Sequence, residues 1–330
     1  MDVRQFGKWL GRTLLFGGGA ITALVLFAPR ESVVLTPRFD AAEVPGPMQL
    51  EAWLAAREGA VPGIVPGLQK RVVWAGAPGQ PTPISLVYLH GFSASAEEIR
   101  PVPDLVAESV GANLFYTRLA GHGRGGAAMA EPAVQDWIDD LAEAVAVGGV
   151  LGERVYLIGT STGATLAAVA ANDAGLSQQI AGVVLISPNF GLAHRFAGLL
   201  TWPLARYWVP LVLGAETGFT PLNEAHGAFW TARYPVKALL PMAALAKAAA
   251  ALDYFTVATP SLFIFSPGDR VVSVPAIHEV SGQWGGPMVA VERQMTPADD
   301  PFAHVIAGDA LSPGQTAETA RIIADWIGTH

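Results

Sequence analysis

One serine in this chain stands in a pattern that could make it a nucleophile. The sequence Gly159-Thr-Ser161-Thr-Gly163 follows an apolar run of strand type and passes directly into the helix-forming stretch 164–171. A strand that turns sharply into a helix strains the backbone of its central residue, and glycines on either side leave room for that turn. The pattern therefore predicts an exposed hydroxyl at Ser161. The alternative, a serine that only caps the helix, accounts less well for the strand before it.

To act as a nucleophile, a serine hydroxyl needs a neighbouring base that takes its proton. When the base is a histidine, a carboxylate holds the ring in the tautomer that can accept this proton. His304 follows the last predicted strand and precedes the final helix, while Asp269 follows the apolar run 261–265. The chain order serine, aspartate, histidine is that of one known class of triads. Asp299 and Asp300 lie close before His304 and are rival acids, but we favour Asp269 because it leaves the end of a strand. The sequence thus predicts a catalytic triad of the serine, Asp269 and His304.

Acyl transfer also requires donors for a developing oxyanion, and two backbone amides are candidates. One is the N–H of Thr162, directly after the predicted nucleophile. The other is the N–H of Phe92, in the segment His90-Gly91-Phe92 that follows the apolar strand 84–89. We expect His90 itself to be structural. No metal or cofactor is expected, because the chain has no cysteine and its other histidines lack the spacing of metal ligands.

Strands and helices alternate along most of the chain and would have to position these residues. We expect strands at residues 71–74, 84–89, 113–117, 155–158, 180–186, 261–265 and 288–295, and helices at 50–57, 97–109, 134–147, 164–171, 242–252 and 315–327. Several strands are continuous apolar runs, which is typical of parallel strands covered on both faces. The sequence therefore predicts an α/β fold with a mostly parallel central sheet and helices on both faces.

The alternation stops between residues 188 and 260. This stretch contains Trp202, Trp208 and Trp230 together with many prolines, and we interpret residues 189–259 as a cap inserted over the carboxyl edge of the sheet. Its aromatic side chains are expected to form the core of the cap more often than to line a substrate site. The predicted organisation is an N-terminal segment at 1–30, a linker at 31–70 and a catalytic domain at 71–330.

The composition agrees with one large buried core. Of the 330 residues, 51% are hydrophobic and only 15% are charged. The formal net charge is −8, and residues 1–30 carry an excess of positive charge, so the rest of the chain is more acidic still. An acidic surface argues against nucleic acid as a partner. The absence of cysteine excludes disulfide bonds and thiolate catalysis.

The N-terminal segment combines positive charges with an apolar run at 13–28. Extended to Trp9, this run is just long enough to span a bilayer. A signal peptide cleaved after Ala28 would need a small residue where the chain has Leu26, so we favour an uncleaved membrane anchor. Positive charge before the run then places the catalytic domain outside the cytoplasm. A cleaved signal, which would give a secreted protein, is the alternative.

These motifs resemble those of serine hydrolases of the α/β-hydrolase superfamily, in particular the carboxylesterase and monoacylglycerol-lipase group. The resemblance rests on His90-Gly91-Phe92, Arg118-Leu119-Ala120-Gly121-His122-Gly123, Trp137 with Asp140, the pentapeptide around Ser161, Gly268-Asp269 with Val271-Val272, and His304. It implies the α/β-hydrolase fold with eight strands, a cap between strands six and seven, and small ester or lipid substrates with apolar acyl groups. Two positions depart from that group, which usually has proline at the position of Ala120 and methionine, glutamine or leucine at that of Thr162.

The triad and the resemblance together predict hydrolysis of carboxylic esters through an acyl-enzyme. Thioesterases, amidases, peptidases and acyltransferases use the same triad, so these activities stay open. A further open alternative is a non-catalytic protein that is tethered to a membrane and uses the pocket to bind a ligand. The intact serine, aspartate and histidine favour the enzyme over the binding protein.

Overall fold

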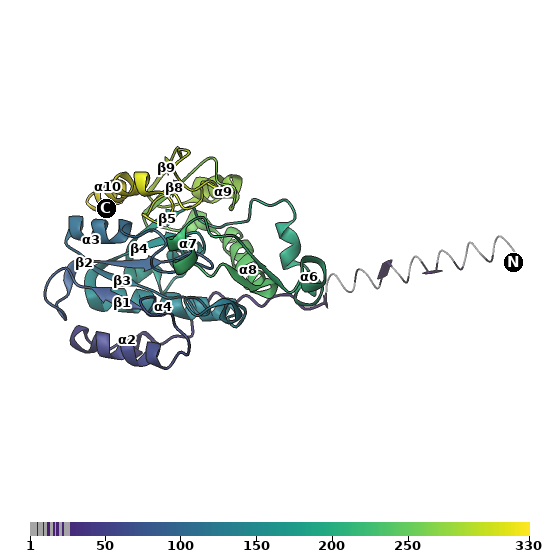
Figure 1. Cartoon of the computed structure of the whole chain (residues 1–330), viewed down its shortest axis with the longest axis horizontal. Coiled ribbons are helices and arrows are strands. Elements are labelled where there is room, and N and C mark those ends of the chain that lie inside the picture. Colours follow the sequence, from purple (N-terminus) through teal and green to yellow (C-terminus); the bar gives the residue numbers. More distant parts are fainter. Residues whose placement is uncertain are drawn as a thin grey trace.

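A mostly parallel sheet forms the centre of the molecule (Figure 1). The computed structural model describes residues 27–330 and eight earlier positions, Gln5, Trp9, Arg12, Thr13, Phe16, Gly18, Gly19 and Thr22. Within this part of the chain the sheet has seven strands, β1 (Arg71–Val73), β2 (Thr82–Leu89), β3 (Asn113–Tyr116), β4 (Gly152–Thr160), β5 (Ile180–Ile186), β8 (Ser261–Phe265) and β9 (Met288–Glu292).

The strands lie in the order β1-β3-β2-β4-β5-β8-β9. Only β1 runs antiparallel to its neighbour, and all other pairs are parallel. Because parallel strands end at the same edge of a sheet, the loops after β2, β4 and β8 all emerge at one edge, with β2 and β4 adjacent and β5 between β4 and β8. These three loops carry Phe92, Ser161 and Asp269. The topology thus gathers residues that are far apart in the sequence.

Helices cover both faces of the sheet, as the fully apolar strands require. The helices of the body are α2 (Leu50–Gly59), α3 (Val102–Val110), α4 (Val134–Leu151), α5 (Thr162–Asn172), α9 (Val274–Gln283) and α10 (Thr316–Ile327). On one face, Leu86 and Tyr88 of β2 belong to a core with α3 and α10, on the upper left in Figure 1. On the other face, Val87 and Leu89 of the same strand belong to a core with α4, α5 and α9. Alternate residues of β2 therefore face opposite cores.

The cap is inserted between β5 and β8. It contains α6 (Ala205–Leu213), α7 (Glu224–Phe229), α8 (Leu239–Ala250) and an antiparallel pair of short strands, β6 (Glu216–Gly218) and β7 (Arg233–Pro235). Short 3-10 helices complete the chain: η1 (Ala41–Glu43), η2 (Pro47–Gln49), η3 (Gly126–Ala130), η4 (Ser177–Gln179), η5 (Ala197–Thr201), η6 (Val236–Ala238), η7 (Tyr254–Thr256) and η8 (Pro313–Gln315). The α8 helix packs on both α4 and α5. The cap therefore rests on the helix that follows Ser161.

The expected α/β architecture is confirmed, and several details differ: β9 ends at Glu292 rather than 295, α8 spans Leu239–Ala250 rather than 242–252, and α4 continues to Leu151. The resemblance implied eight strands, whereas the described sheet has seven, so the cap follows the fifth strand of the sheet rather than the sixth. At the β1 edge the chain before Arg71 forms η1, η2 and α2, and it adds no further strand there. The helix expected at 97–109 begins only at Val102, because a proline at 101 disfavours helical geometry at Arg100.

The predicted membrane anchor at residues 1–30 lies for the most part outside the described residues. Among the residues that are described, no helix combines the length and the apolar character needed to cross a membrane. The predicted linker at 31–70 lies against the body through α2 and through ion pairs. Its Arg38 side chain donates hydrogen bonds to Asp139 on α4, with the Nη2 to Oδ2 distance at 2.7 Å.

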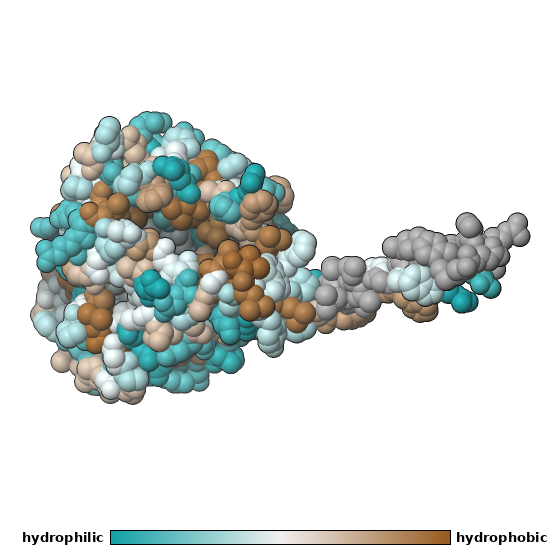
Figure 2. Space-filling view, turned by 45° about the vertical axis from the view of Figure 1, so that its right-hand side comes forward, coloured by the Kyte–Doolittle hydropathy of each residue, from teal (hydrophilic) through white to brown (hydrophobic). Residues whose placement is uncertain are grey.

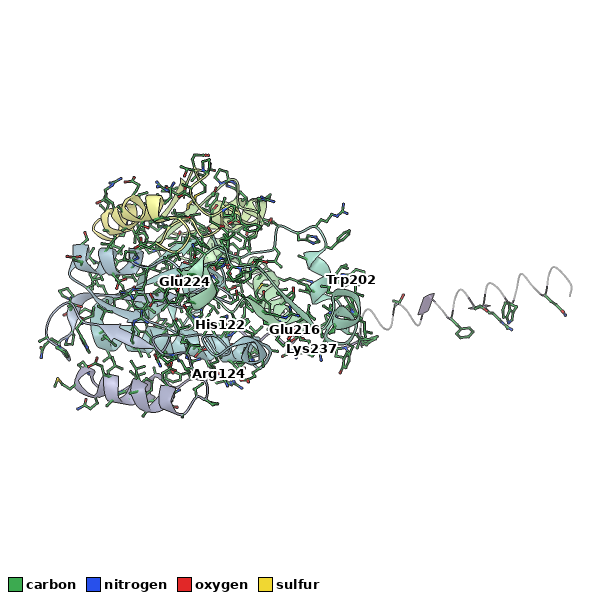
Figure 3. All side chains as sticks on the ribbon, viewed as in Figure 1. His122, Arg124, Trp202, Glu216, Glu224 and Lys237 are labelled. Carbon is green, nitrogen blue, oxygen red and sulfur yellow. The ribbon has the colours of Figure 1, made fainter. Side chains whose placement is uncertain are left out.

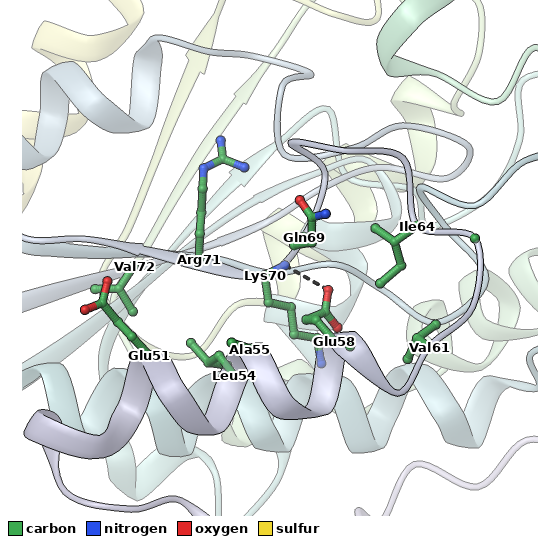
Figure 4. A pocket seen from close by; sticks show the side chains of 12 residues that line it. Glu51, Leu54, Ala55, Glu58, Val61, Ile64, Gln69, Lys70, Arg71 and Val72 are labelled. Carbon is green, nitrogen blue, oxygen red and sulfur yellow. Dashed lines mark hydrogen bonds between the residues drawn. The ribbon is translucent and has the colours of Figure 1, made fainter.

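A buried group of charges joins α2 to the body beneath β1. Glu58, at the end of α2, accepts two hydrogen bonds from the Arg118 guanidinium at 2.7 and 2.8 Å and one from the Lys70 N–H at 2.9 Å. Figure 4 shows the last of these bonds above α2. The ammonium of Lys70 in turn lies 2.5 Å from a carboxylate oxygen of Glu143 and 3.1 Å from one of Asp140. Each buried charge thus has at least one partner of opposite sign.

We expect the substitution Arg118→Met to lower the free energy of unfolding by about 3 to 5 kcal/mol, because it leaves the buried Glu58 carboxylate without its cation. Burial by itself raises the pKa of Glu58, but the hydrogen bonds from Arg118 and Lys70 outweigh it and lower that pKa. The stabilisation is therefore present above the unfolded pKa and is lost as the pH falls through the lower folded value. Urea unfolding at pH 7 measures the effect.

The double variant Glu58→Leu with Arg118→Met is the matched control. It removes both charges and should be more stable than Arg118→Met alone, since no unpaired carboxylate stays buried. A single variant within about 0.5 kcal/mol of the unmodified protein would show that this ion pair does not hold the linker.

Candidate active site

Ser161 lies at the sharp turn between β4 and α5. Its backbone has φ 52° and ψ −114°, a left-handed geometry that is strained for any residue with a side chain. Gly163 has no room for a Cβ, which would collide with the backbone carbonyl of Leu89, and a Cβ on Gly159 would collide with Gly163. The two glycines of the pentapeptide are therefore needed where they stand, and the turn has the geometry of a nucleophile elbow.

Asp269 and His304 are in direct contact. The Nδ1 atom of His304 lies 2.8 Å from the Oδ2 atom of Asp269, whose side chain is fully buried. The other carboxylate oxygen of Asp269 accepts hydrogen bonds from the N–H groups of Val271 and Val272 at 2.8 and 2.9 Å. Both oxygens are thus engaged, and the carboxylate is fixed in the orientation that can hold the imidazole.

The environment of His304 favours its charged form. Burial alone would lower the pKa of this histidine, but the adjacent Asp269, with smaller contributions from Glu98 and Asp300, raises it above its ordinary value. A carboxylate that stabilises the imidazolium is what a general base requires when it takes a proton from an alcohol.

The rival acids Asp299 and Asp300 contact backbone and neighbouring polar side chains rather than the imidazole. Asp300 accepts hydrogen bonds from the N–H groups of Phe302, His304 and Val305 at 2.9 to 3.1 Å. Asp299 accepts from the Thr296 N–H and hydroxyl and from Gln315. Both carboxylates therefore shape the loop that presents His304, whereas Asp269 alone among the three contacts its ring.

Ser161 and His304 line the same cavity and are both buried, so the hydroxyl that was predicted to be exposed faces this cavity rather than open solvent. No hydrogen bond joins the Ser161 hydroxyl to the His304 ring within the described part of the chain. In unliganded sites such bonds are often long and form only when substrate is bound. The three predicted triad residues are therefore assembled at one edge of the sheet, with the imidazole–carboxylate pair made and the serine beside it.

The two predicted oxyanion donors come from neighbouring loops. Neither the Phe92 N–H nor the Thr162 N–H donates to an acceptor in the part of the chain that the structure describes. The Phe92 ring is held by edge-to-face contacts with His122, Trp137 and Tyr234, at centroid distances of 5.7, 6.3 and 5.4 Å. An aromatic anchor thus fixes the loop whose amide is free to bind a substrate oxygen.

The cavity beside the triad holds about 350 Å³ and is walled mainly by apolar side chains. Body and cap both contribute to its wall, with Phe92, Val271, Phe302, Val305 and Leu311 from the body and Leu192, Phe219, Leu222, Trp230, Tyr234, Leu239 and Met242 from the cap. The expectation that cap aromatics mainly form cap core holds only in part. Trp208 packs against the core of the cap, but Trp230 lines the cavity.

Three other residues of the resemblance, His90, Trp137 and Asp140, hold loops and do not line the cavity. His90, as expected, is structural, since its Nε2 atom accepts the Leu119 N–H at 3.1 Å and its Nδ1 contacts the Gly91 carbonyl. Trp137 donates its indole N–H to the carbonyl of Ala120 at 3.0 Å. Asp140 accepts the N–H of Ala120 at 2.6 Å, a bond that proline, the usual residue of that group, could not donate. The departure at this position therefore adds a hydrogen bond.

Glu98 is a polar residue of the cavity wall that the sequence analysis did not single out. Glu98 is buried, lines the cavity with Ser161 and His304, and accepts a hydrogen bond from the Gly91 N–H at 2.7 Å. In the sequence it stands beside Glu97, which pairs with Arg71 and Arg100 at the surface. Nothing in the local pattern separates the two glutamates, because the difference arises from the direction in which each side chain leaves a non-helical turn.

The described residues contain no group of three or more histidine, aspartate or glutamate side chains that could hold a metal ion. A further hollow of about 490 Å³ lies between α2 and β1 and contains none of the predicted site residues (Figure 4). The cavity at the triad is therefore the place where the predicted chemistry and a substrate-sized space coincide.

Comparison with known proteins identifies a family and a fold for this chain. The family model Hydrolase_4, described as serine aminopeptidase, S33, matches residues 81–286. No protein with a curated description matches the chain significantly in sequence. One similar solved structure comes from LipS and LipT, two metagenome-derived lipolytic enzymes, with 20% identity, a TM-score of 0.63, and coverage of 81% of this chain and 100% of that chain.

Two further similar structures are those of a monoacylglycerol lipase and a monoglyceride lipase. Monoacylglycerol lipase of Paleococcus ferrophilus is 14% identical with a TM-score of 0.57, covering 80% of this chain and 99% of that one. A soluble variant of the Saccharomyces cerevisiae monoglyceride lipase is 11% identical with a TM-score of 0.58, covering 79% and 91%. These likenesses establish the fold, and the family match extends over more than half of the residues. This chain is therefore a member of the Hydrolase_4 family and has the α/β-hydrolase fold.

Proposed function

We propose that this protein is a serine hydrolase that cleaves carboxylic esters with apolar acyl groups. The observation that carries the proposal is the contact of 2.8 Å between His304 and Asp269 at the rim of an apolar cavity that Ser161 also lines. The strained turn at Ser161 is typical of a nucleophilic serine. The apolar walls of the cavity favour the binding of an apolar acyl group.

The proposed mechanism proceeds in two halves. His304, with its Nδ1–H directed at Asp269, takes the hydroxyl proton of Ser161 on Nε2 while the serine oxygen attacks the ester carbonyl. The carbonyl oxygen becomes an oxyanion that the N–H groups of Phe92 and Thr162 stabilise. As the C–O bond of the leaving alcohol breaks, His304 protonates that oxygen, and an acyl-enzyme remains. Water then attacks the acyl-enzyme with the same assistance, which releases the acid and restores the serine.

The substrate class can be tested with p-nitrophenyl acetate, butyrate, octanoate and palmitate. Each buried methylene contributes about 0.8 kcal/mol, so we expect kcat/KM to rise about three- to fourfold per methylene until the cavity is filled, and to fall for palmitate. The p-nitroanilide and thioester of octanoic acid address the open alternatives of amidase and thioesterase. A preference for acetate with no dependence on chain length, or faster cleavage of the anilide, would contradict the proposed substrate class.

We further propose that the N-terminal segment anchors the protein to a membrane with the catalytic domain outside the cytoplasm. The chain that leaves this segment lies against the cap, where the Leu204 N–H donates to the Pro29 carbonyl at 2.8 Å and Arg206 pairs with Glu31. Apolar side chains are exposed beside this junction on the cap, among them Trp202, Tyr207, Leu211, Val212 and Leu213. Figure 3 shows Trp202 next to α6, and Figure 2 shows hydrophobic surface on the side that carries the N-terminal segment.

Flotation of the full-length protein with phospholipid vesicles tests the anchor. We expect the unmodified protein to float, and the variant Ile21→Arg with Leu24→Arg to stay in the dense fraction. Each arginine near the centre of an apolar segment costs about 2.5 to 3.5 kcal/mol on insertion. Equal flotation of both proteins would contradict anchoring by this segment, and the activity of the variant in detergent serves as its folding control.

A further inference from the structure

Glu98 is a buried carboxyl group directly beneath the loop that carries Phe92. Its Oε2 atom lies 2.7 Å from the Gly91 nitrogen and 3.1 Å from the Tyr88 hydroxyl, which in turn lies 3.1 Å from the hydroxyl of Thr160. The side chain is almost completely inaccessible, with the residue 2% exposed. A carboxyl group from the segment before α3 thus connects the loop after β2, through Tyr88, to Thr160 at the end of β4, directly before Ser161.

Gly91 lies close to both Glu98 and the nucleophile. A Cβ atom built on Gly91 would lie 2.6 Å from Oε1 of Glu98 and 3.2 Å from the Cβ atom of Ser161. The carboxyl group and the serine therefore both border residue 91, and a side chain at this position would displace the Glu98 carboxyl group. Glu98 also lines the cavity that Ser161 and His304 line.

No lysine or arginine of the described chain pairs with Glu98. The titratable groups that act on it are Tyr88 on β2 and His304 in the loop before α10. Burial raises the pKa of Glu98 to about 7, although the Gly91 N–H and His304 act in the opposite direction. Burial of a carboxyl group without a cation is costly, and a carboxyl group in a cleft with a strongly shifted pKa is a candidate for a functional role.

We propose that Glu98 is a positioning residue for the oxyanion loop and that its charge tunes His304. This inference rests on the proposed function, since it assigns a role within the same site. By accepting the N–H of Gly91, Glu98 fixes the peptide that immediately precedes the Phe92 amide, and thereby the direction of that donor. A shift of about 1 Å in such a donor is enough to cost about a hundredfold in rate.

The charge of Glu98 has a second consequence. As a neutral acid, Glu98 still accepts hydrogen bonds from the Gly91 N–H and the Tyr88 hydroxyl. It then places no negative charge near the developing oxyanion. As an anion it stabilises the imidazolium of His304, to which Asp269 and Asp300 already contribute. Removing this charge should therefore lower the pKa of His304, and the neutral base should be available at lower pH.

Two variants separate positioning from charge. Glu98→Ala removes the acceptor of the Gly91 N–H, and we expect kcat for p-nitrophenyl butyrate to fall about 10- to 100-fold with KM changed less than about threefold. Glu98→Gln keeps a carbonyl acceptor and removes the charge. We expect it to retain kcat within about fivefold at the pH optimum, and to move the acid limb of kcat/KM to lower pH by about half a pH unit as a single titration.

Glu97→Gln is the matched control, because it makes the same change one residue away on a side chain directed at Arg71 and Arg100. It should leave the acid limb where it is. Glu98→Ala with unchanged kcat, or Glu98→Gln with an unshifted acid limb, would overturn the inference. If Glu98→Ala does not fold, the pH profile of Glu98→Gln still decides. Failure of the proposed function is distinguishable, because then the unmodified protein and Glu97→Gln would be inactive as well.

Discussion

The substitution Ser161→Ala is expected to lower kcat for p-nitrophenyl octanoate by a factor of about 10⁴ to 10⁶, the loss seen when a catalytic nucleophile is removed from a triad. Alanine has no hydroxyl to acylate, while the cavity, Asp269 and His304 stay in place. Binding of substrate should change little, so KM or the affinity for a product acid should stay within about fivefold.

Labelling with a fluorophosphonate probe gives an independent measurement of the same substitution. Only a serine activated by a neighbouring base reacts rapidly, so we expect the unmodified protein to be labelled and Ser161→Ala to be inert. Ser177→Ala, at a serine in η4 that does not line the cavity, is the matched control and should be labelled normally. An unlabelled native protein would favour the alternative of a binding protein. An alanine variant with full activity would remove Ser161 from the mechanism.

The second large effect is expected for Asp269→Asn, which should lower kcat about 10³- to 10⁴-fold. An asparagine can still accept the N–H groups of Val271 and Val272 on one oxygen, so the loop should keep its shape. Its amide NH₂ would then face Nδ1 of His304, which favours the tautomer that carries the proton on Nε2. That tautomer cannot act as the base for Ser161.

Asp299→Asn makes the matched substitution at one of the rival acids. This carboxylate accepts hydrogen bonds from Thr296 and Gln315 and does not contact the imidazole. We expect less than a tenfold loss of kcat, with thermal unfolding monitored to separate stability from chemistry. If Asp299→Asn were as damaging as Asp269→Asn, or if Asp269→Asn kept kcat within tenfold, the assignment of Asp269 as the partner of His304 would be wrong.

Local sequence predicted the elements well where a single physical constraint dominates. The strands at 180–186 and 261–265 have the predicted bounds. A short, fully apolar run between turn residues is typical of a parallel strand that is buried on both faces. The elbow at Ser161 was predictable because its flanking glycines have no room for side chains. By contrast, the start of α3 was misplaced, because the proline at 101 competes with the helical periodicity around it.

The cap was predicted as an insertion over the carboxyl edge of the sheet, but which of its aromatic side chains line the cavity was not predicted. Trp230 and Tyr234 line the cavity while Trp202 is exposed, and all three stand in similar stretches of sequence rich in proline and aromatic residues. Which of them faces the substrate depends on how α8 packs on α4 and α5 and on where β6 and β7 pair. These are contacts between distant segments, which local patterns do not encode.

The sequence by itself determined the fold class, because strands and helices alternate along most of the chain. It also determined the nucleophile turn and a short list of bases and acids, because these depend on neighbours within a few residues. Only the tertiary structure decided that Asp269, rather than Asp299 or Asp300, contacts His304, and that Glu98 rather than Glu97 enters the cavity wall. The physical reason is the same in both cases. Identical carboxylates gain different roles from burial and from the partners that other strands bring to them, and these are properties of the folded chain alone.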